Sequence, residues 1–289
     1  MRPHRAGPYW LSAPALAVYA AFLVVPLASI GLISFQHFEF YGGIQPGLTL
    51  ENYRAVLGDS YYWEIFGRTF AIAALVTIFC AVLGMLEAIV LYRMADPWRS
   101  LFLLVVLGPL LISVVVRTLG WALLFGSTGL INKALQTLGL IAEPIQFMYS
   151  TTGVVIALVH VLVPFVVISV WASLQKMDPA VERAAVSLGA GQLTVVSRVI
   201  VPLAMPGILA GSVIVFALAA SAFATPAIIG GRRLKVIATA AYDEFLNTLN
   251  WPLGASLAVL LLLANVVLLY ASNRLIKRRY KSVFAESAA

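Results

Sequence analysis

Six long apolar runs constrain this chain more than any other feature of its sequence. They cover residues 10–35, 69–92, 100–125, 153–174, 199–222 and 253–273. An α-helix needs about 20 mostly apolar residues to cross the hydrocarbon core of a membrane. Backbone exposed to lipid must satisfy its own hydrogen bonds, and no segment alternates like a barrel strand, so the runs predict helices. The sequence therefore predicts an all-α polytopic membrane protein with six transmembrane helices.

Composition supports this class and excludes several others. Hydrophobic residues make up 62% of the chain and charged residues 11%, whereas soluble domains are about 25% charged. The one cysteine, Cys80, lies inside an apolar run, which excludes a disulfide framework and a cysteine-based metal site. The histidines are far apart in the sequence, so we expect no metal site. His160, within the fourth run, is expected to hydrogen-bond between helices.

Lysine and arginine are distributed unequally between the two sets of loops, and this predicts the orientation. One set carries twelve cations: Arg2, Arg5, Arg93, Arg99, Lys176, Arg183, Arg198, Arg274, Lys277, Arg278, Arg279 and Lys281. The other set carries six cations: Arg54, Arg68, Lys133, Arg232, Arg233 and Lys235. Seven acidic residues lie in the same loops. The excess predicts that both termini are cytoplasmic. The net charge of +7 is then a topology signal and a contact for lipid headgroups, and no nucleic acid is required as a partner.

The predicted cytoplasmic segment 178–207 has the pattern of two short helices. Asp178 followed by Pro179 is typical of a helix start, and Gly189 is predicted to end that helix. Small apolar residues recur between them at helical spacing: Ala180, Val181, Ala184, Ala185 and Leu188. A second helix over 192–201 would re-enter the membrane. The small apolar face suits entry into a partner's groove, and the pattern fits a helix lying on the membrane surface equally well.

This segment resembles the EAA loop of binding-protein-dependent ABC transporter permeases. The signature is Glu-Ala-Ala, three residues, Gly, nine residues, then Ile-x-Leu-Pro. Val199 and Val201 are conservative replacements in it. Arg183 occupies the glutamate position, and Glu182 comes one residue earlier. The resemblance implies a coupling loop over 176–202 that docks on an ATPase through these residues: Glu182, Arg183, Ala184, Ala185, Gly189 and Pro202.

The resemblance extends over most of the chain from about Phe66 onward. The stretches PLLISVVVRTLGW, GLINKALQTLGLI, FATPAIIGG and NWPLGASLAVLLL are similar to the first permease subunit of spermidine/putrescine importers. This implies a type I ABC importer permease fold in the bacterial inner membrane. The implied partners are a second homologous permease subunit, two cytoplasmic ATPase subunits and a periplasmic substrate-binding protein. Residues 1–64 would form the N-terminal tail, first helix and periplasmic loop, 65–275 the permease domain, and 276–289 a basic cytoplasmic tail.

The chain is expected to be a non-catalytic subunit. It has no G-x-x-x-x-G-K-[ST] phosphate loop and no Ser/His/Asp cluster or dinucleotide fingerprint. We therefore expect no cofactor in this chain, with ATP and Mg bound by the partner ATPase.

Two ionisable residues lie within the predicted spans, where charges are costly and often functional. On straight helices rising about 1.5 Å per residue, Glu87 lies about 8 Å and Arg117 about 26 Å from the cytoplasmic end, too far apart to pair. Together with Ser221 and Thr225 they are candidates for the translocation path or gate. The alternatives are interfacial placement for Glu87 and bonding of backbone carbonyls by Arg117.

A cationic cluster on the predicted outer side is the last candidate site. Arg232, Arg233 and Lys235 are candidates to contact a binding protein, and a solvated loop is the alternative reading.

Other transport classes stay open. An ion-gradient-driven secondary transporter would use membrane carboxylates and inverted repeats, and we find only Glu87 and no repeat. An ABC importer permease for another solute, such as iron, a phosphonate, an opine or an amino-acid derivative, is the other alternative.

Overall fold

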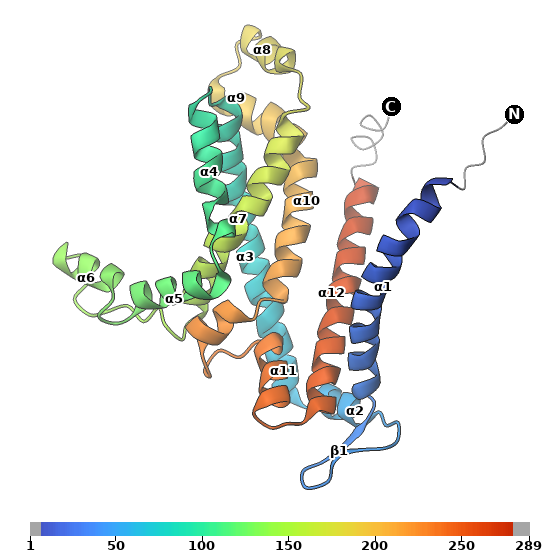
Figure 1. Cartoon of the computed structure of the whole chain (residues 1–289). Coiled ribbons are helices and arrows are strands. Elements are labelled where there is room, and N and C mark those ends of the chain that lie inside the picture. The colour runs from blue at the N-terminus through green and yellow to red at the C-terminus, as the bar shows by residue number, and fades with distance from the viewer. Residues whose placement is uncertain (1–6, 280–289) are drawn as a thin grey trace, which may run out of the picture. The chain divides into compact units, whose positions relative to one another are not determined.

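A computed structural model describes residues 7–279 of the chain, with side chains from 12 to 274 (Figure 1). Arg2, Arg5, Lys281 and the end of the predicted basic tail lie outside the described residues. The chain divides into two compact units. The first comprises the described residues up to Trp63 together with Ala240–Leu263, and the second comprises Glu64–Thr239 and the described residues from Ala264 onward.

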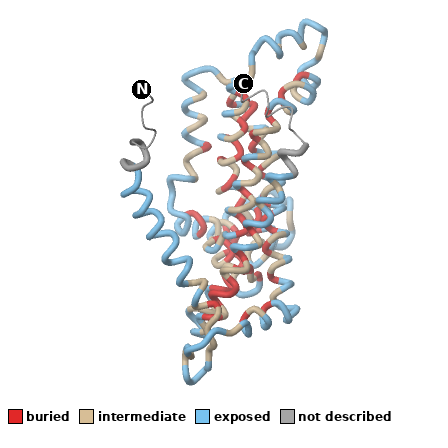
Figure 2. Tube along the Cα trace, turned by 90° about the vertical axis from the view of Figure 1, so that its right-hand side faces the viewer, coloured by how far each residue is buried: buried red, intermediate tan, exposed pale blue. Residues whose placement is uncertain are grey.

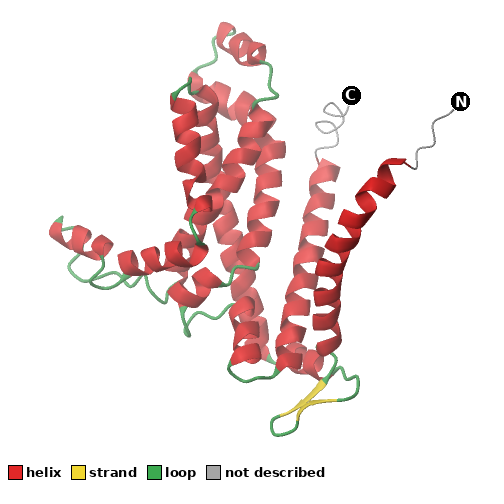
Figure 3. Ribbon diagram, viewed as in Figure 1, coloured by secondary structure: helices red, strands yellow, loops and turns green. Residues whose placement is uncertain are grey.

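The first unit holds a long apolar helix and a small surface structure. Its elements are α1 (Gly7–Ile33), β1 (His37–Glu39), β2 (Gly43–Gln45), α2 (Glu51–Gly58) and parts of α3, α11 and α12. The strands form an antiparallel hairpin with Phe38 opposite Ile44 (Figure 3). Asn52 of α2 donates to the carbonyls of Ser34 at 3.0 Å and Gln36 at 2.8 Å, which fixes the segment after α1. From residue 12 onward, the residues of α1 are exposed over most of its length (Figure 2).

This surface structure agrees only in part with the sequence prediction. Helix α2 lies between the first two apolar runs, within the segment expected to be a periplasmic loop. The hairpin was not predicted. The second long helix begins at Ser60, nine residues before the predicted start at 69. The residues 60–68 include Trp63, Glu64 and Arg68, so hydropathy alone did not mark this part as helical.

The second unit contains most of the helices. In chain order its elements are α3 (Ser60–Arg93), α4 (Trp98–Leu111), α5 (Val114–Phe125), α6 (Leu130–Thr137), α7 (Thr151–Leu174), α8 (Pro179–Ser187), α9 (Gln192–Val195), η1 (Val196–Ile200), α10 (Val201–Ala220), η2 (Pro226–Gly230), α11 (Ile237–Leu246) and α12 (Trp251–Arg279). The elements η1 and η2 are single π-helical turns. Residues of α3, α11 and α12 are shared between the two units.

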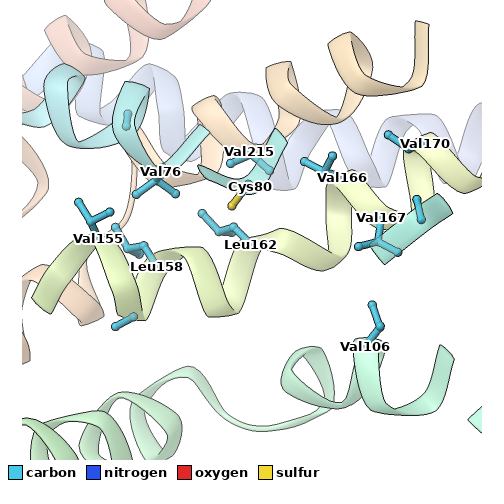
Figure 4. Packing of buried hydrophobic residues seen from close by; sticks show 14 of the residues in the cluster. Val76, Cys80, Val106, Val155, Leu158, Leu162, Val166, Val167, Val170 and Val215 are labelled. Carbon is cyan, nitrogen blue, oxygen red and sulfur yellow. The ribbon is translucent and has the colours of Figure 1, made fainter. Parts of the chain in front are cut away.

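The core of the second unit lies around α7. Buried residues of α7 such as Leu158 and Val166 pack with Val76 and Cys80 of α3 and with Val215 of α10 (Figure 4). Val106 of α4 belongs to the same cluster, so apolar side chains of α7 face α3, α4 and α10 (Figure 4). This explains why the sequence of α7 is a continuous apolar run and not an amphipathic pattern.

Two glycines bring α10 against α7. A Cβ added at Gly207 would lie 2.4 Å from the Ser169 carbonyl oxygen, and one at Gly211 would lie 2.9 Å from the Val166 Cα. The spacing of four residues places both glycines on one face of α10. Small residues at this spacing allow the backbones of membrane helices to approach closely.

The third predicted span is not one continuous helix. Residues 100–125 belong to α4 and α5, which are separated by Ile112, in extended conformation, and by Ser113, which is also non-helical. Pro109 has no backbone N–H and disfavours a continuous helix, and α4 ends two residues later. At about 1.5 Å per residue, the 14 residues of α4 span about 21 Å, less than the about 30 Å of a hydrocarbon core.

Six helical segments of the described chain are long and apolar enough to cross a membrane. They are Ser12–Ile33, Ser60–Arg93, Val114–Thr137, Thr151–Leu174, Gln192–Ala220 and Trp251–Arg274. The predicted number of spans is therefore confirmed, with the third shifted toward the C-terminus and α4 left as a shorter apolar helix. The predicted orientation of the termini stays a prediction.

Candidate functional site

The segment between α7 and α10 folds as the sequence predicts. The Asp178 carboxylate accepts a hydrogen bond from the Ala180 backbone N–H at 2.8 Å, and Pro179 is the first helical residue of α8. The helix ends at Ser187. Gly189 follows with φ of +84°, a conformation that favours glycine. The predicted helix start and glycine elbow are both confirmed.

Helix α8 leaves most of its surface uncovered. All nine of its residues are described and none is buried. Val181 and Val186 are 45% and 56% exposed, and Leu188, just after the helix, is 88% exposed. Glu182 and Ala185 are partly buried, and Ala185 packs against the core of the second unit. The predicted apolar face is thus divided, with Ala185 turned inward and Ala184 exposed.

A polar cluster attaches α8 to the end of α3. The Arg93 guanidinium donates from Nη2 to Glu182 Oε1 at 2.8 Å and from Nη1 to Gln192 Oε1 at 3.0 Å. Arg93 is the last residue of α3, Glu182 lies in α8, and Gln192 begins α9. One side chain therefore joins three elements. We refer to Arg93, Glu182 and Gln192 as the Arg93 clamp.

The clamp also places two predicted cytoplasmic loops at the same end of the second unit. Sequence reasoning used Arg93 only as a topology charge and did not assign it to this site. No local pattern relates Arg93 to Glu182, because 89 residues separate them. Only the packing of α3 near α8 reveals the contact.

The chain returns from α8 into α10 through a π-helical turn. The N–H of Val201 bonds to the Val196 carbonyl, five residues back, which closes η1. Pro202 follows at the start of α10. Because Pro202 has no N–H, it is placed where the regular helical bond pattern changes. The predicted second helix over 192–201 and the proline junction are confirmed as α9, η1 and the first turn of α10.

Arg117 of α5 lies at the break between α4 and α5. Its side chain is 8% exposed, and its Nη1 donates to the Pro109 carbonyl at the end of α4. The depth expected for Arg117 on a straight helix does not apply, because the helix is interrupted at Ile112–Ser113. The contact agrees with the alternative in which Arg117 bonds a backbone carbonyl.

Polar side chains from three elements meet near this break. Thr118 Oγ1 lies 3.3 Å from Thr225 Oγ1, and Trp121 Nε1 donates to His160 Nδ1 at 3.3 Å. The second contact confirms the expectation that His160 bonds between helices. The structure thus places Thr225 next to Thr118, the residue that follows Arg117. Ser221 is exposed and donates to the Ala217 carbonyl at 2.7 Å.

Glu87 lies elsewhere, on α3, six residues before Arg93. Its side chain is half-buried. Within the described part of the chain, no hydrogen bond or ion pair joins it to Arg117, Ser221 or Thr225. The four path candidates therefore do not form one cluster, and their role in transport stays a prediction.

The cationic turn between η2 and α11 presents two charges. Arg232 and Arg233 are exposed, while Leu234 and Val236 beside them are buried and anchor the turn. The Lys235 carbonyl accepts a hydrogen bond from Arg68 Nη1 at 3.4 Å. The exposure of the two arginines is compatible with contact to another protein, which stays a prediction.

Comparisons with known proteins agree on one family. Residues 73–282 match the family model described as "Binding-protein-dependent transport system inner membrane component". The spermidine/putrescine transport system permease protein PotB of Salmonella typhimurium (strain SL1344) is 32% identical over 238 residues, which cover 81% of this chain and 83% of that protein. PotB of Escherichia coli (strain K12) is 32% identical over 234 residues, 80% and 85% of the two chains.

Solved structures share the fold over nearly the whole chain. A chain of a bacterial ABC transporter involved in the import of the acidic polysaccharide alginate superposes with a TM-score of 0.79, covering 93% of this chain and 94% of that chain. The two sequences are 18% identical, so this likeness shows the fold alone.

Proposed function

This chain belongs to the family of binding-protein-dependent transport system inner membrane components, and from that premise we propose that it forms the permease subunit of an ATP-driven importer for polyamine-like small polar solutes. It is a multi-pass inner-membrane protein. The observation that carries the substrate class is the 32% identity to PotB over about four fifths of both chains. PotB is named as a permease of a spermidine/putrescine transport system.

The proposed complex contains a second homologous permease, two cytoplasmic ATPase subunits and a periplasmic binding protein. ATP and Mg are bound by the ATPase subunits, and the chain itself is non-catalytic. The exposed helix α8 is the proposed contact with an ATPase subunit, because it leaves an apolar surface uncovered. Arg232 and Arg233, exposed on their turn, are proposed to contact the binding protein.

A mechanical connection from α8 to the membrane supports this assignment. Helix α8 is fixed at its start by the Asp178 cap and joined to α3 by the Arg93 clamp. It continues through α9 and η1 into α10, which packs closely on α7 through Gly207 and Gly211. Displacement of α8 by a closing ATPase would therefore move α10 and α3 together. Such movement of packed helices is a common way to open and close a path between membrane helices.

Co-purification tests the class of transporter. The chain is co-expressed with the proteins encoded by neighbouring genes and purified in mild detergent. We expect recovery of an ATPase with its own phosphate loop. Replacing the exposed Ala184 with Trp should abolish recovery, because the large ring blocks close approach of α8. The matched control is Ala95→Trp, at another exposed position on the same predicted side of the membrane.

Uptake by proteoliposomes tests the energy source and the solute. We expect the purified complex, with ATP and binding protein, to take up labelled spermidine even when a protonophore removes the proton gradient. Spermidine uptake by this chain alone, driven by a proton gradient, would contradict the proposal and favour a secondary transporter. ATP-dependent uptake of a phosphonate in preference to spermidine would correct the substrate class only.

A further inference from the structure

Two adjacent residues of α8 carry opposite charges and have different surroundings. The Glu182 side chain is 25% exposed and accepts a charge-assisted hydrogen bond from Arg93. Arg183 is exposed. Among the side chains that the structure describes, none makes a hydrogen bond or ion pair with Arg183. The carboxylate is therefore already paired within the chain, and the guanidinium is not.

Helix geometry shows on which side of α8 Arg183 lies. Successive residues of an α-helix are separated by about 100° around the axis. Because the Arg93 clamp and the packing of Ala185 fix the inward side of α8, Arg183 is directed away from the clamp. It lies on the exposed side together with Ala184, and the exposed Leu188 follows about one turn later. The outward face is thus small and apolar with one cation at its edge.

The cation and the apolar residues of this face determine which side chains a partner surface needs. A cation removed from water on docking is costly unless it is paired and hydrogen-bonded. A partner surface with a cation at this position would repel Arg183, whereas a carboxylate could bond it through two parallel N–H groups. Apolar lining would receive Val181, Ala184 and Leu188.

We propose that Arg183 is the charge that α8 presents to the cytoplasmic ATPase subunit, and that the groove receiving α8 carries a carboxylate opposite it. Glu182 then serves as a positioning residue that holds α8 against α3 through Arg93. This proposal rests on the proposed function, in which α8 docks on an ATPase. Of the two adjacent charges, Arg183, at the position of the signature glutamate, is then the one that meets the partner.

Charge reversal in the complete complex tests the proposal. The permease is co-expressed with its ATPase and purified, and the ATPase retained per permease is measured at low salt. We expect Arg183→Glu to reduce retention about tenfold or more, the effect of losing about 1.4 kcal/mol of binding, and Arg183→Lys to retain most of it. Arg274→Glu is the matched control, because Arg274 is also exposed and lies on the same predicted side of the membrane, but in α12 and outside the predicted coupling loop 176–202. It should bind as the wild type does.

A second substitution on the ATPase makes the test specific. In the Arg183→Glu complex, changing the carboxylate of the ATPase groove to Lys should restore retention, because the pair is re-formed with its charges exchanged. An unfolded permease cannot be rescued in this way. Rescue therefore also separates a charge effect from a loss of folding.

The outcomes distinguish this proposal from the one it rests on. If the wild-type complex forms, Ala184→Trp breaks it and Arg183→Glu does not weaken it, α8 docks but Arg183 is not the contact, and the inference is wrong. If Arg183→Glu weakens the complex and no acidic residue of the groove gives rescue, the carboxylate partner is wrong. If the wild-type chain retains no ATPase at all, the proposed function itself is wrong.

Discussion

Helices α10 and α8 belong to the same unit but are held in place by different physical means. Helix α10 packs on α7 through glycines so close that a single added Cβ would overlap the neighbouring backbone. Helix α8 has no buried residue and is held by its cap, its glycine elbow and the Arg93 clamp. The contact of α10 with α7 lies entirely within the chain. The contacts of α8 leave it exposed, and this exposure is the reason why we propose α8 as the contact with a partner.

The largest effect is expected where the packing is closest. Gly207→Ala places a Cβ 2.4 Å from the Ser169 carbonyl oxygen, so α10 must shift away from α7. Overpacking of this kind costs about 1–3 kcal/mol, and we expect a lower Tm of the purified permease in detergent. The matched control is Gly67→Ala in α3, where nothing lies within 4 Å of the added atom. Equal Tm values for the two variants would show that α10 does not depend on this contact.

The next effect concerns the elbow after α8. Gly189 has φ of +84°, and a side chain in left-handed conformation costs about 1–2 kcal/mol. We expect Gly189→Ala to increase hydrogen exchange of the α8 amides while leaving those of α7 unchanged. Gly191→Ala is the control two residues away, where φ is negative and the added Cβ meets nothing within 4 Å. Faster exchange in both variants would argue against a special role for the elbow.

The cap at the start of α8 is expected to contribute slightly less. Asp178→Ala removes the acceptor for the Ala180 N–H, and loss of a helix cap costs about 1 kcal/mol. Exchange of the first amides of α8 should increase, and Asp178→Asn should keep most of the protection because its side-chain oxygen can still accept. If Asp178→Asn exchanges as fast as Asp178→Ala, the negative charge matters more than the hydrogen bond.

The smallest effect on stability is expected for the clamp. Arg93 and Glu182 are 35% and 25% exposed, and partly exposed ion pairs contribute less than about 1 kcal/mol. A double-mutant cycle of Arg93→Ala and Glu182→Gln, followed by Tm, should give a small coupling that decreases with added salt. Transport should decrease far more than Tm, since the clamp orients α8. A matching loss of Tm and transport would make the clamp an ordinary structural bond.

The contrast between the two helices also explains what the sequence could predict. Helix α8 was predictable because Asp178, Pro179 and Gly189 act locally, within a few residues of the ends they determine. The apolar runs were predictable for the same reason. The break between α4 and α5 was not predicted, because the run 100–125 is mostly apolar on both sides of it and the ending of α4 at Leu111 depends on how both helices pack.

Contacts between distant residues were beyond prediction. Arg93 and Glu182 are 89 residues apart, and Gly207 meets Ser169 only because α10 runs beside α7. The division of α8 into an inward Ala185 and an outward Ala184 likewise depends on the direction from which α3 approaches. In each case the residue type is compatible with the contact, but the sequence does not show which distant residue is the neighbour.

The closure of α8 by its own cap and elbow has a consequence for how such transporters diversify. Substitutions at Arg183, Ala184 and Ser187 would leave the Asp178 bond, the Gly189 turn and the Arg93 contact in place. The exposed residues of this nine-residue helix can therefore be replaced without loss of the bonds that hold it. If α8 docks on an ATPase as proposed, the surface that selects the ATPase can change without disturbing the bonds that hold the helix.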